Sequence, residues 1–252
     1  MADKPLKIVR IMDRLNVGGP AVHAVLTSEG LSSEKTGGRV DTLLIHGHVT
    51  DDEEEMSHLF EGRPGLRRHV LPTLSRPISP LKDLRAFLSI LWILLRDRPD
   101  VVHTHKSKAG ALGRIAAWIA RVPVRVHTFH GQVFEGYFSE GASENIVRVE
   151  RFLSTLSHGV LAISPALREE LERDYRIAHP DKLRVVPLGL DLEALANPTE
   201  KRRLQRELGL SQNLPAVGIV GRLVPIKNQA LFLRAAAKVA TRVPDLQVFV
   251  VG

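Results

Sequence analysis

The stretch VGIVGRLVPIKN, from Val217 to Asn228, decides the fold because it joins a buried strand to a helix through a short basic loop. Its first residues are apolar and predict a strand that ends at Gly221. Asn228 is a residue type that caps helices well, and the alanine-rich segment 229–240 after it has the composition of a helix. A second apolar segment, Val248–Val251, predicts another strand. We therefore expect a strand–helix–strand unit with parallel strands.

Two cations lie in the loop of this unit. Arg222 and Lys227 both fall at the carboxyl edge of the expected sheet, beside the start of the helix. Free backbone N–H groups, the helix dipole and two fixed positive charges together favour a phosphate group at such a place. An ordinary solvated loop explains the same residues equally well when this segment is taken alone.

The composition is that of a globular protein with a basic balance. The 252 residues are enough for about one to two domains; 44% of them are hydrophobic and 25% are charged. The net charge of +7 is typical of proteins that bind nucleic acid, anionic lipid or an anionic small substrate. The chain has no cysteine, which excludes disulfides and thiolate metal sites, and residues 1–7 are too polar for a signal peptide. We therefore expect a cytoplasmic protein.

The distribution of the basic residues argues against nucleic acid, because they do not form one continuous stripe. The densest clusters are Lys201, Arg202, Arg203 and Arg206, and then Arg63, Arg67 and Arg68. Aromatic residues make up only 5% of the chain, so platforms that stack single-stranded bases are scarce. Nucleic acid is therefore the least favoured of the three partner classes, and no nucleic-acid partner is expected.

Strands and helices alternate along most of the chain. Apolar runs predict strands at 6–12, 40–45, 69–71, 101–105, 124–129, 160–164 and 183–186. Helical periodicity and start signals predict helices at 21–31, 81–95, 109–120, 146–156 and 165–175, and a polar helix ending near 208. Such alternation is typical of parallel sheets covered by helices, and hence of the α/β class.

The segment 81–95 is the most apolar of these helices. We expect it to pack on the sheet through one stripe formed by Leu84, Phe87, Leu88, Leu91 and Leu95. The apolar run Leu84–Leu95 is too short to cross a bilayer, which takes about 20 residues. Contact with the membrane surface remains an alternative use of the same stretch.

A domain boundary is expected at the segment Pro187–Asp191, which reads PLGLD. Residues 1–187 then form a first Rossmann-like domain, and residues 188–252 form a linker with the opening of a second one. One helix and two strands cannot complete a doubly wound domain, so the second sheet should have an open edge. We expect the chain to stop within this second domain.

Polar residues follow several of the expected strands, where open α/β sheets bind their ligands. Gly18 and Gly19 follow the first strand; such a pair lets backbone N–H groups approach a ligand, although by itself it indicates only a tight turn. Lys106 and Lys108 follow the strand 101–105.

Four histidines lie on or near two neighbouring strands. His103 and His105 alternate and should face the same side of the sheet, while His127 and His130 mark the end of the strand 124–129. A zinc site is disfavoured, because no acidic residue accompanies them at ligand spacing. His130 is the better candidate for a polar donor to a substrate hydroxyl or for a proton carrier.

Taken together, the motifs resemble a known family. NVGGP, HTHKSKAGALGR, VHTFHG, the Glu150–Arg151 pair, ISPALREEL, PLGLD and GRLVPIKN look like the family-4 retaining glycosyltransferases of the GT-B fold, over nearly the whole chain. The resemblance implies two Rossmann-like domains that face each other across a cleft. The first would carry the acceptor side and the second would bind the nucleotide sugar.

The resemblance also implies roles for individual residues. Arg222 and Lys227 would hold the donor diphosphate, and the backbone of Gly18 and Gly19 would meet the same phosphates. His130 would contact the transferred sugar. The acceptor side would carry His105, Lys106 and Lys108.

The chain departs from the family's pattern at its end. The family's two glutamates, eight positions apart, and its pocket for the nucleotide base would lie beyond Gly252. Glu53 and Glu61 have the same spacing but sit in a polar stretch near the start, so we interpret them as coincidence. The chain thus carries the acceptor domain and only the opening of the donor domain.

The resemblance implies transfer of a hexose from a nucleoside diphosphate sugar to a hydroxyl acceptor, such as a lipid-linked glycan, with retention of configuration. The enzyme would need no cofactor and, since no DxD-like acidic motif is present, no metal; fixed cations would stabilise the leaving diphosphate. Polysaccharide biosynthesis at the inner membrane face fits this activity. The alternatives are a nucleotide-sugar 2-epimerase of the same fold and a non-catalytic nucleotide-sugar-binding fragment.

Overall fold

The protein forms two compact units, Met1–Leu190 and Asp191–Gly252, each described here by itself. The computed structural model describes residues 4–51, 53–131, 140–190, 192–196, 202–221 and 223–252. The division between the units falls inside the PLGLD segment, after Leu190.

Unit 1 is built on a seven-stranded parallel sheet with the strand order β3-β2-β1-β4-β5-β6-β7. The strands are β1 (Leu6–Arg14), β2 (Val40–Gly47), β3 (Arg67–Val70), β4 (Val101–His105), β5 (Val124–Phe129), β6 (Gly159–Ala162) and β7 (Leu183–Val185). The order reverses between β1 and β4, as in other doubly wound sheets, and such a switch point is where these sheets open a crevice for a ligand.

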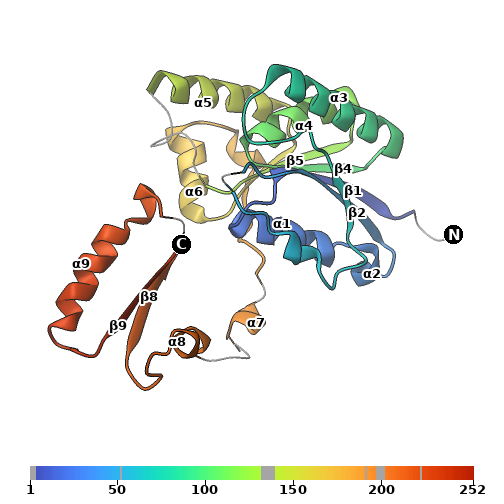
Figure 1. Ribbon diagram of the computed structural model, residues 1–252. Coiled ribbons are helices and arrows are strands. Elements are labelled where there is room, and N and C mark those ends of the chain that lie inside the picture. Colours follow the sequence, from blue (N-terminus) through green and yellow to red (C-terminus); the bar gives the residue numbers. More distant parts are fainter. Residues whose placement is uncertain (1–3, 52, 132–139, 191, 197–201, 222) are drawn as a thin grey trace. The chain divides into compact units, whose positions relative to one another are not determined.

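Helices cover both faces of this sheet. They are α1 (Gly19–Gly30), α2 (Ser33–Thr36), α3 (Pro80–Asp97), α4 (Ser107–Ile119), α5 (Glu140–Thr155) and α6 (Pro165–Glu169). Figure 1 shows α3 and α4 on one face and α1 and α2 on the other. The helix expected over 165–175 is α-helical only as far as Glu169 and continues as a π-helical turn over Glu170–Asp174.

Small residues let α4 lie close against the sheet. A Cβ atom at Gly113 would come within 2.7 Å of Cγ2 of Thr104, and one at Gly110 within 2.5 Å of Cε1 of His127. Neither neighbour has room to give way in a packed interior, so only glycine fits at these two positions. The motif KAGALGR therefore seats α4 on β4 and β5, and this contact positions the loop that precedes the helix.

A buried ion pair ties α4 to α5. Nη2 of Arg114 donates to Oε2 of Glu150 at 2.6 Å, and both side chains are almost fully buried. Burial lowers the pKa of Arg114 and raises that of Glu150, while the attraction between the two charges opposes both shifts. Breaking such a pair is costly because the remaining charge stays buried without a partner.

The helix α3 packs on the core through a face that we did not expect. Its core-facing side chains are Ala86, Ile90, Ile93 and Leu94, with Phe87 and Leu91 half-buried beside them. Leu84, Leu88 and Leu95 are instead between 52% and 54% exposed, so the expected stripe is wrong in three of its five members. The helix is apolar around most of its circumference, and only packing against the sheet and α4 selects the buried side.

Unit 2 holds the elements α7 (Leu192–Ala196), α8 (Arg203–Glu207), β8 (Ala216–Val220), α9 (Gln229–Ala240) and β9 (Gln247–Val251). The strands β8 and β9 pair in parallel, as expected, with α9 between them in sequence. The N-cap prediction is confirmed, because Oδ1 of Asn228 accepts a hydrogen bond from the N–H of Leu231 at 3.2 Å. The polar helix expected to end near residue 208 is wrong as one element: two short helices are described there.

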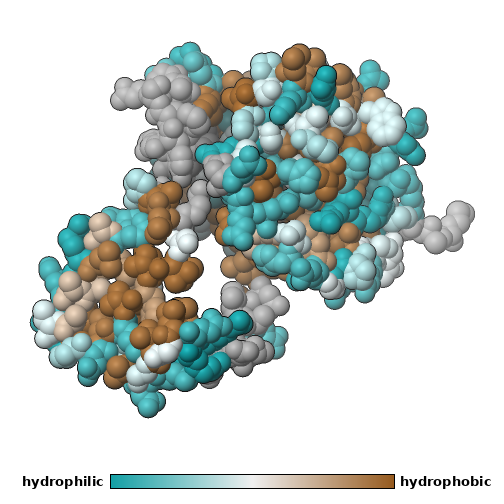
Figure 2. Space-filling model, in the orientation of Figure 1, coloured by the Kyte–Doolittle hydropathy of each residue, from teal (hydrophilic) through white to brown (hydrophobic). Residues whose placement is uncertain are grey.

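Little of unit 2 is buried. Among its described residues, only Gln205 and Ala236 are buried. Figure 2 shows apolar side chains gathered on the surface of this unit. They belong to both strands and to α9, and include Val217, Val220, Leu231, Leu233, Val248 and Val250. The open sheet edge expected from the sequence is thus accompanied by an exposed apolar surface.

Candidate functional site

The candidate site in unit 1 lies where β1, β4 and β5 end. Gly18 and Gly19 follow β1, His105 ends β4 with Lys106 after it, and His130 follows β5. Because β1 neighbours β4 and β4 neighbours β5, these ends share one edge of the sheet at the switch point.

The turn after β1 depends on glycine. Gly18 has a φ of 152°, a conformation that residues with a Cβ rarely adopt, and it caps α1 without a side chain. Gly19 begins the helix and lies against Leu188, whose Cδ1 would be 3.7 Å from a Cβ at that position. The start of α1 therefore presents backbone rather than side chains at this edge.

Four histidines gather at this edge, and the sequence had singled out all of them except His23. The ring centroids of His103 and His105 are 4.3 Å apart, those of His105 and His130 5.2 Å apart, and those of His23 and His130 5.6 Å apart. The prediction that His103 and His105 face the same side is confirmed. His23 joins them from α1, and its Nδ1 accepts a hydrogen bond from the N–H of Gly189 at 3.1 Å.

His127 lies apart from this group. It alternates with its strand neighbours onto the other face of the sheet, where its Nδ1 is 2.8 Å from Oγ1 of Thr104 and its ring meets α4. The four histidines that suggested zinc are therefore not one cluster. No group of three or more histidine, aspartate or glutamate side chains in the described part of the chain has an arrangement that holds a metal ion.

An arginine that the sequence analysis missed completes the group. Arg10 lies on β1 with 1% of its surface exposed, and its Nη2 is 3.0 Å from Nε2 of His105. Its Nη1 donates to Oγ1 of Thr27 on α1. A lone arginine inside an apolar strand carries no periodic signal, so only the fold reveals its partners.

Burial keeps the imidazoles of this group neutral. It lowers the pKa of His130 to about 3, helped by the neighbouring His23, and the pKa of His23 to about 4, helped by Arg10. The pKa values of His103 and His105 also lie well below the ordinary value, chiefly because of burial. At neutral pH these rings act as hydrogen-bonding groups without charge.

Lys106 is held by its own neighbours. Its Nζ lies 3.2 Å from Oδ1 of Asp13 and 2.7 Å from Oδ1 of Asn16. Burial lowers its pKa, and Asp13 opposes that shift. Its backbone has a φ of 60°, which is uncommon for a residue with a side chain and marks local strain at the end of β4.

Two further ion pairs occupy charges at this edge. Arg14 bonds both oxygens of Glu53, with Nη2 2.6 Å from Oε1, and this bond lowers the pKa of Glu53. Lys108 pairs with Asp83 at the start of α3. The cations of unit 1 that the sequence placed on the acceptor side are therefore neutralised by internal carboxylates.

The candidate site in unit 2 follows β8. Gly221 ends the strand with a φ of 153°, and the side chain of Lys227 lies across it, with Cδ and Cε 3.8 Å from the position of a Cβ. The side chain of Lys227 is exposed and has no ion-pair partner among the described residues. Arg222, the other predicted phosphate ligand, lies outside the described residues.

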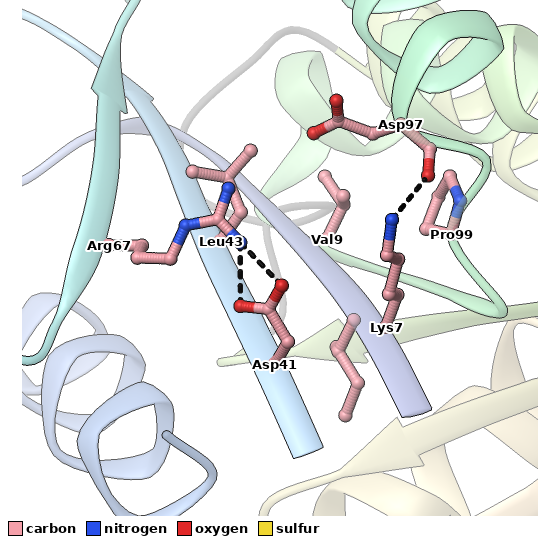
Figure 3. Close-up of a pocket in the computed structure, with 8 residues that line it drawn as sticks. Lys7, Val9, Asp41, Leu43, Arg67, Asp97 and Pro99 are labelled. Carbon is pink, nitrogen blue, oxygen red and sulfur yellow. Dashed lines mark hydrogen bonds and ion pairs between the residues drawn. The ribbon is translucent and has the colours of Figure 1, made fainter. Parts of the chain in front are cut away.

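A hollow at the opposite edge of the sheet is not part of this site. It is lined by the first residues of β1, β2 and β3 and by the end of α3 (Figure 3). Both of its cations are bonded internally: Nη1 of Arg67 donates to Asp41 at 2.6 Å, and Nζ of Lys7 donates to the carbonyl of Asp97 at 3.3 Å. Ligands of doubly wound sheets bind at the carboxyl edge instead.

The segment that carries the residues of this carboxyl edge matches the model of a known family. The family model described as Glycosyltransferase Family 4 matches residues 17–194, which include the Gly18–Gly19 turn and the histidines. The chain belongs to glycosyltransferase family 4. Its relatives include the UDP-Gal:alpha-D-GlcNAc-diphosphoundecaprenol alpha-1,3-galactosyltransferase of Escherichia coli, 35% identical over 190 residues that cover 74% of this chain and 49% of the relative.

A second relative matches a similar share of the chain. The alpha-maltose-1-phosphate synthase of Mycolicibacterium smegmatis is 30% identical over 185 residues, which cover 71% of this chain and 46% of that protein. This family-4 chain thus spans about half the length of the relatives it matches.

Solved structures share the fold. The structure of Anabaena HepE in complex with UDP has a TM-score of 0.64 at 18% identity, and covers 97% of this chain and 69% of its own. The sucrose-phosphate synthase of Thermosynechococcus elongatus has a TM-score of 0.66 at 19% identity, with coverages of 98% and 62%. The UDP-GlcNAc 2-epimerase of Neisseria meningitidis bound to UDP-GlcNAc has a TM-score of 0.61 at 15% identity, with coverages of 97% and 65%. The family-4 chain therefore has the GT-B fold that its motifs resembled.

None of the helices that the structure describes has both the length and the apolar character that a membrane crossing requires. Even α3, the longest apolar helix, lacks the length and hydropathy needed to cross a bilayer.

Proposed function

We propose that the protein transfers a hexose from a nucleoside diphosphate sugar to a hydroxyl acceptor, with retention of configuration and without a metal. The observation that carries the proposal is Lys227, an exposed cation beside Gly221 at the end of β8, in a chain of glycosyltransferase family 4. Lys227 has no ion-pair partner among the residues that the structure describes. An unpaired lysine at the carboxyl edge of a parallel strand is a suitable partner for a phosphate.

Each predicted residue has a part in the proposed reaction. The leaving diphosphate gains negative charge as the sugar departs, and Lys227 with Arg222 would stabilise that charge. The backbone of Gly18 and Gly19 would approach the same phosphates. His130 would hold the transferred sugar through a neutral ring nitrogen.

The acceptor side would be formed by the edge that carries His105, Lys106 and Lys108. Because both lysines are paired with Asp13 and Asp83, this edge offers the acceptor little net positive charge. A neutral edge suits a sugar hydroxyl better than a free phosphate.

Transfer is tested with the complete protein, a set of UDP-hexoses and a polyprenyl-diphosphate-linked sugar. We expect a new glycosidic bond with the anomeric configuration of the donor, at a rate unchanged by EDTA. Lys227→Ala should lower turnover about tenfold to a hundredfold, since a charge-assisted hydrogen bond contributes about 1.5–3 kcal/mol. The matched control is Lys238→Ala, an exposed lysine on α9, which should behave as wild type. Equal turnover of both variants would show that Lys227 does not stabilise the leaving diphosphate.

Nucleotide-sugar 2-epimerisation is a second candidate, because UDP-GlcNAc 2-epimerases share the fold. The two activities differ in their need for an acceptor. An epimerised sugar formed from the donor alone would favour the epimerase. If the chain binds UDP in calorimetry but the complete protein turns over neither substrate, the protein is a nucleotide-sugar-binding module.

A lipid-linked acceptor is supported by the Escherichia coli relative, whose name specifies a diphosphoundecaprenol-linked sugar. The exposed face of α3 supports the same class of acceptor. It carries Leu81, Leu84, Leu88, Trp92 and Leu95 at helical spacing, all more than half exposed, with Lys82, Arg85 and Arg96 beside them. Apolar and tryptophan side chains flanked by cations are typical of helices that lie in an anionic membrane surface.

We therefore place the protein at the cytoplasmic face of the membrane, attached peripherally. Flotation with anionic vesicles at low salt should carry the protein upward, and neutral vesicles should carry less. Trp92→Ser should weaken this flotation, whereas Phe152→Ser, which removes a similarly exposed aromatic ring from α5, should not. No binding of the wild type to anionic vesicles would contradict the peripheral attachment.

A further inference from the structure

Arg10 is an unusual residue for the interior of a sheet. Its guanidinium is buried, and no carboxylate bonds it among the residues that the structure describes. Burial lowers its pKa to about 10, and its Nε has no hydrogen-bond partner in the described ranges. A buried charge without a counter-charge costs free energy, and the two hydrogen bonds of Arg10, to Thr27 and His105, offset part of that cost.

The contact with His105 has only one possible direction. A guanidinium donates hydrogen bonds and cannot accept them. Nη2 of Arg10, 3.0 Å from Nε2 of His105, is therefore the donor, and Nε2 of the neutral His105 ring is the acceptor. The single ring proton of His105 must then lie on Nδ1.

The same reasoning extends to the next ring. Nδ1 of His105 is 2.9 Å from Nε2 of His130. Since Nδ1 of His105 carries the proton, Nε2 of His130 accepts it, and the neutral ring of His130 must carry its own proton on Nδ1. That Nδ1 has no hydrogen-bond partner in the described part of the chain, although it is shielded from solvent.

We propose that Arg10 is a positioning residue which, through His105, fixes the tautomer of His130 so that His130 presents an N–H donor at Nδ1. The inference rests on the proposed function only for the identity of the ligand, which would be an oxygen of the transferred sugar. The direction of the hydrogen bonds follows from the geometry alone.

This arrangement prevents His130 from acting as a general base. Its one lone pair, on Nε2, points at the N–H of His105, so a proton placed there would face another donor. The surrounding groups also disfavour a positive charge on the ring of His130. They are Arg10 on β1, Lys106 after β4 and His23 on α1. His130 therefore donates a hydrogen bond and transfers no proton.

Arg10, His105 and His130 form a row of hydrogen-bonded side chains, called the relay below. The contacts of Arg10 with α1 hold this relay in place. Oγ1 of Thr27, which accepts from Nη1 of Arg10, itself donates to the carbonyl of His23 at 2.5 Å. His23 in turn accepts from the N–H of Gly189, so its neutral ring carries the proton on Nε2. The relay thus connects β1, α1, β4 and the loop after β5.

The ring nitrogens report the tautomers directly. In the chain labelled with ¹⁵N-histidine, two-bond ¹H–¹⁵N correlations at pH 7.5 distinguish a protonated from an unprotonated ring nitrogen. We expect protonated Nδ1 and unprotonated Nε2 for both His105 and His130, and the reverse for His23. A protonated Nε2 on His130 in the wild type would overturn the proposal without the need for any variant or substrate.

Variants separate positioning from simple structural support. Arg10→Met removes the donor, so the two nitrogens of His130 should show averaged, mixed signals, and Arg10→Lys should restore the wild-type pattern. The control is Arg114→Met, which removes another buried arginine that does not touch His105. It should lower stability and leave the pattern of His130 unchanged. A wild-type pattern in folded Arg10→Met would also overturn the proposal.

Kinetics of the complete protein give a second readout. Arg10→Met should lower kcat about threefold to tenfold, which corresponds to the loss of one neutral hydrogen bond, and Arg10→Lys should recover it. The wild-type kcat should show no ionisation of His130 between pH 6.5 and 9. A protein with the expected tautomers but no transferase activity would refute the proposed function and leave the relay intact; the opposite result would refute the relay alone.

Discussion

Mild acid should unfold unit 1, because its interior holds histidines that cannot take up protons while folded. Burial lowers the pKa values of His23, His103, His105, His127 and His130, to about 4 for His23 and about 3 for His130. In the unfolded chain the same rings titrate near 6.5. The unfolded state therefore binds more protons below that pH, and stability falls as the pH falls.

The size of the effect follows from proton linkage. Between pH 7.5 and 5.5, one histidine that protonates only on unfolding lowers the free energy of unfolding by about 1.4 kcal/mol. The five histidines together lower it by up to about 7 kcal/mol, against a total of about 5–15 kcal/mol for a typical domain. The loss begins near pH 6.5 and continues until the folded rings themselves titrate.

Urea unfolding at a series of pH values measures this directly. Circular dichroism follows the whole chain, and the emission of Trp92 and Trp118, its two tryptophans, reports on unit 1. His127→Gln removes one buried ring, so the loss between pH 7.5 and 5.5 should shrink by about 1.4 kcal/mol. His58→Gln, at an exposed position, should leave the wild-type dependence unchanged.

A wild-type loss below about 1.4 kcal/mol over this interval would refute the reasoning, since not even one buried histidine would then stay neutral in the folded protein. If wild type and His127→Gln lose the same free energy of unfolding between pH 7.5 and 5.5, the ring of His127 does not contribute to the pH dependence. The histidines at the carboxyl edge would then account for it.

Three further predictions concern stability. Gly47→Ala should cost about 3 kcal/mol, because a Cβ there would lie 1.4 Å from the carbonyl oxygen of Leu74; Gly30→Ala, with no atom within 4 Å, is the control for thermal unfolding. Glu150→Ala should cost about 3–5 kcal/mol in urea unfolding, because its arginine partner on α4 stays buried, and a cost below 1 kcal/mol would refute a buried pair. Unit 2 should exchange its amide hydrogens faster than unit 1 and promote self-association, so uniform protection in a monodisperse monomer would contradict its exposed apolar surface.

The glycine-ended loops show how much of the candidate site the sequence could predict. Gly18 and Gly221 each follow an apolar run, and both adopt the φ values that only glycine takes readily. The positions of His105 and His130 at strand ends were also predictable, because strand ends are local features of the chain. The pairing of the cations was not predictable: Lys106 and Lys108 are paired with carboxylates distant in sequence, whereas Lys227 has no such partner in the described part of the chain.

The sequence by itself determined the alternation of strands and helices, the α/β class and the family, because strand and helix periodicities and short motifs are properties of neighbouring residues. Only the tertiary structure decided which side of α3 is buried, and only it joined Arg10 and His23 to the histidines of β4 and to His130 after β5. These contacts link positions up to 107 residues apart, from His23 to His130. A hydrogen bond between such residues has no local signature, since it exists only when the sheet order brings their strands together.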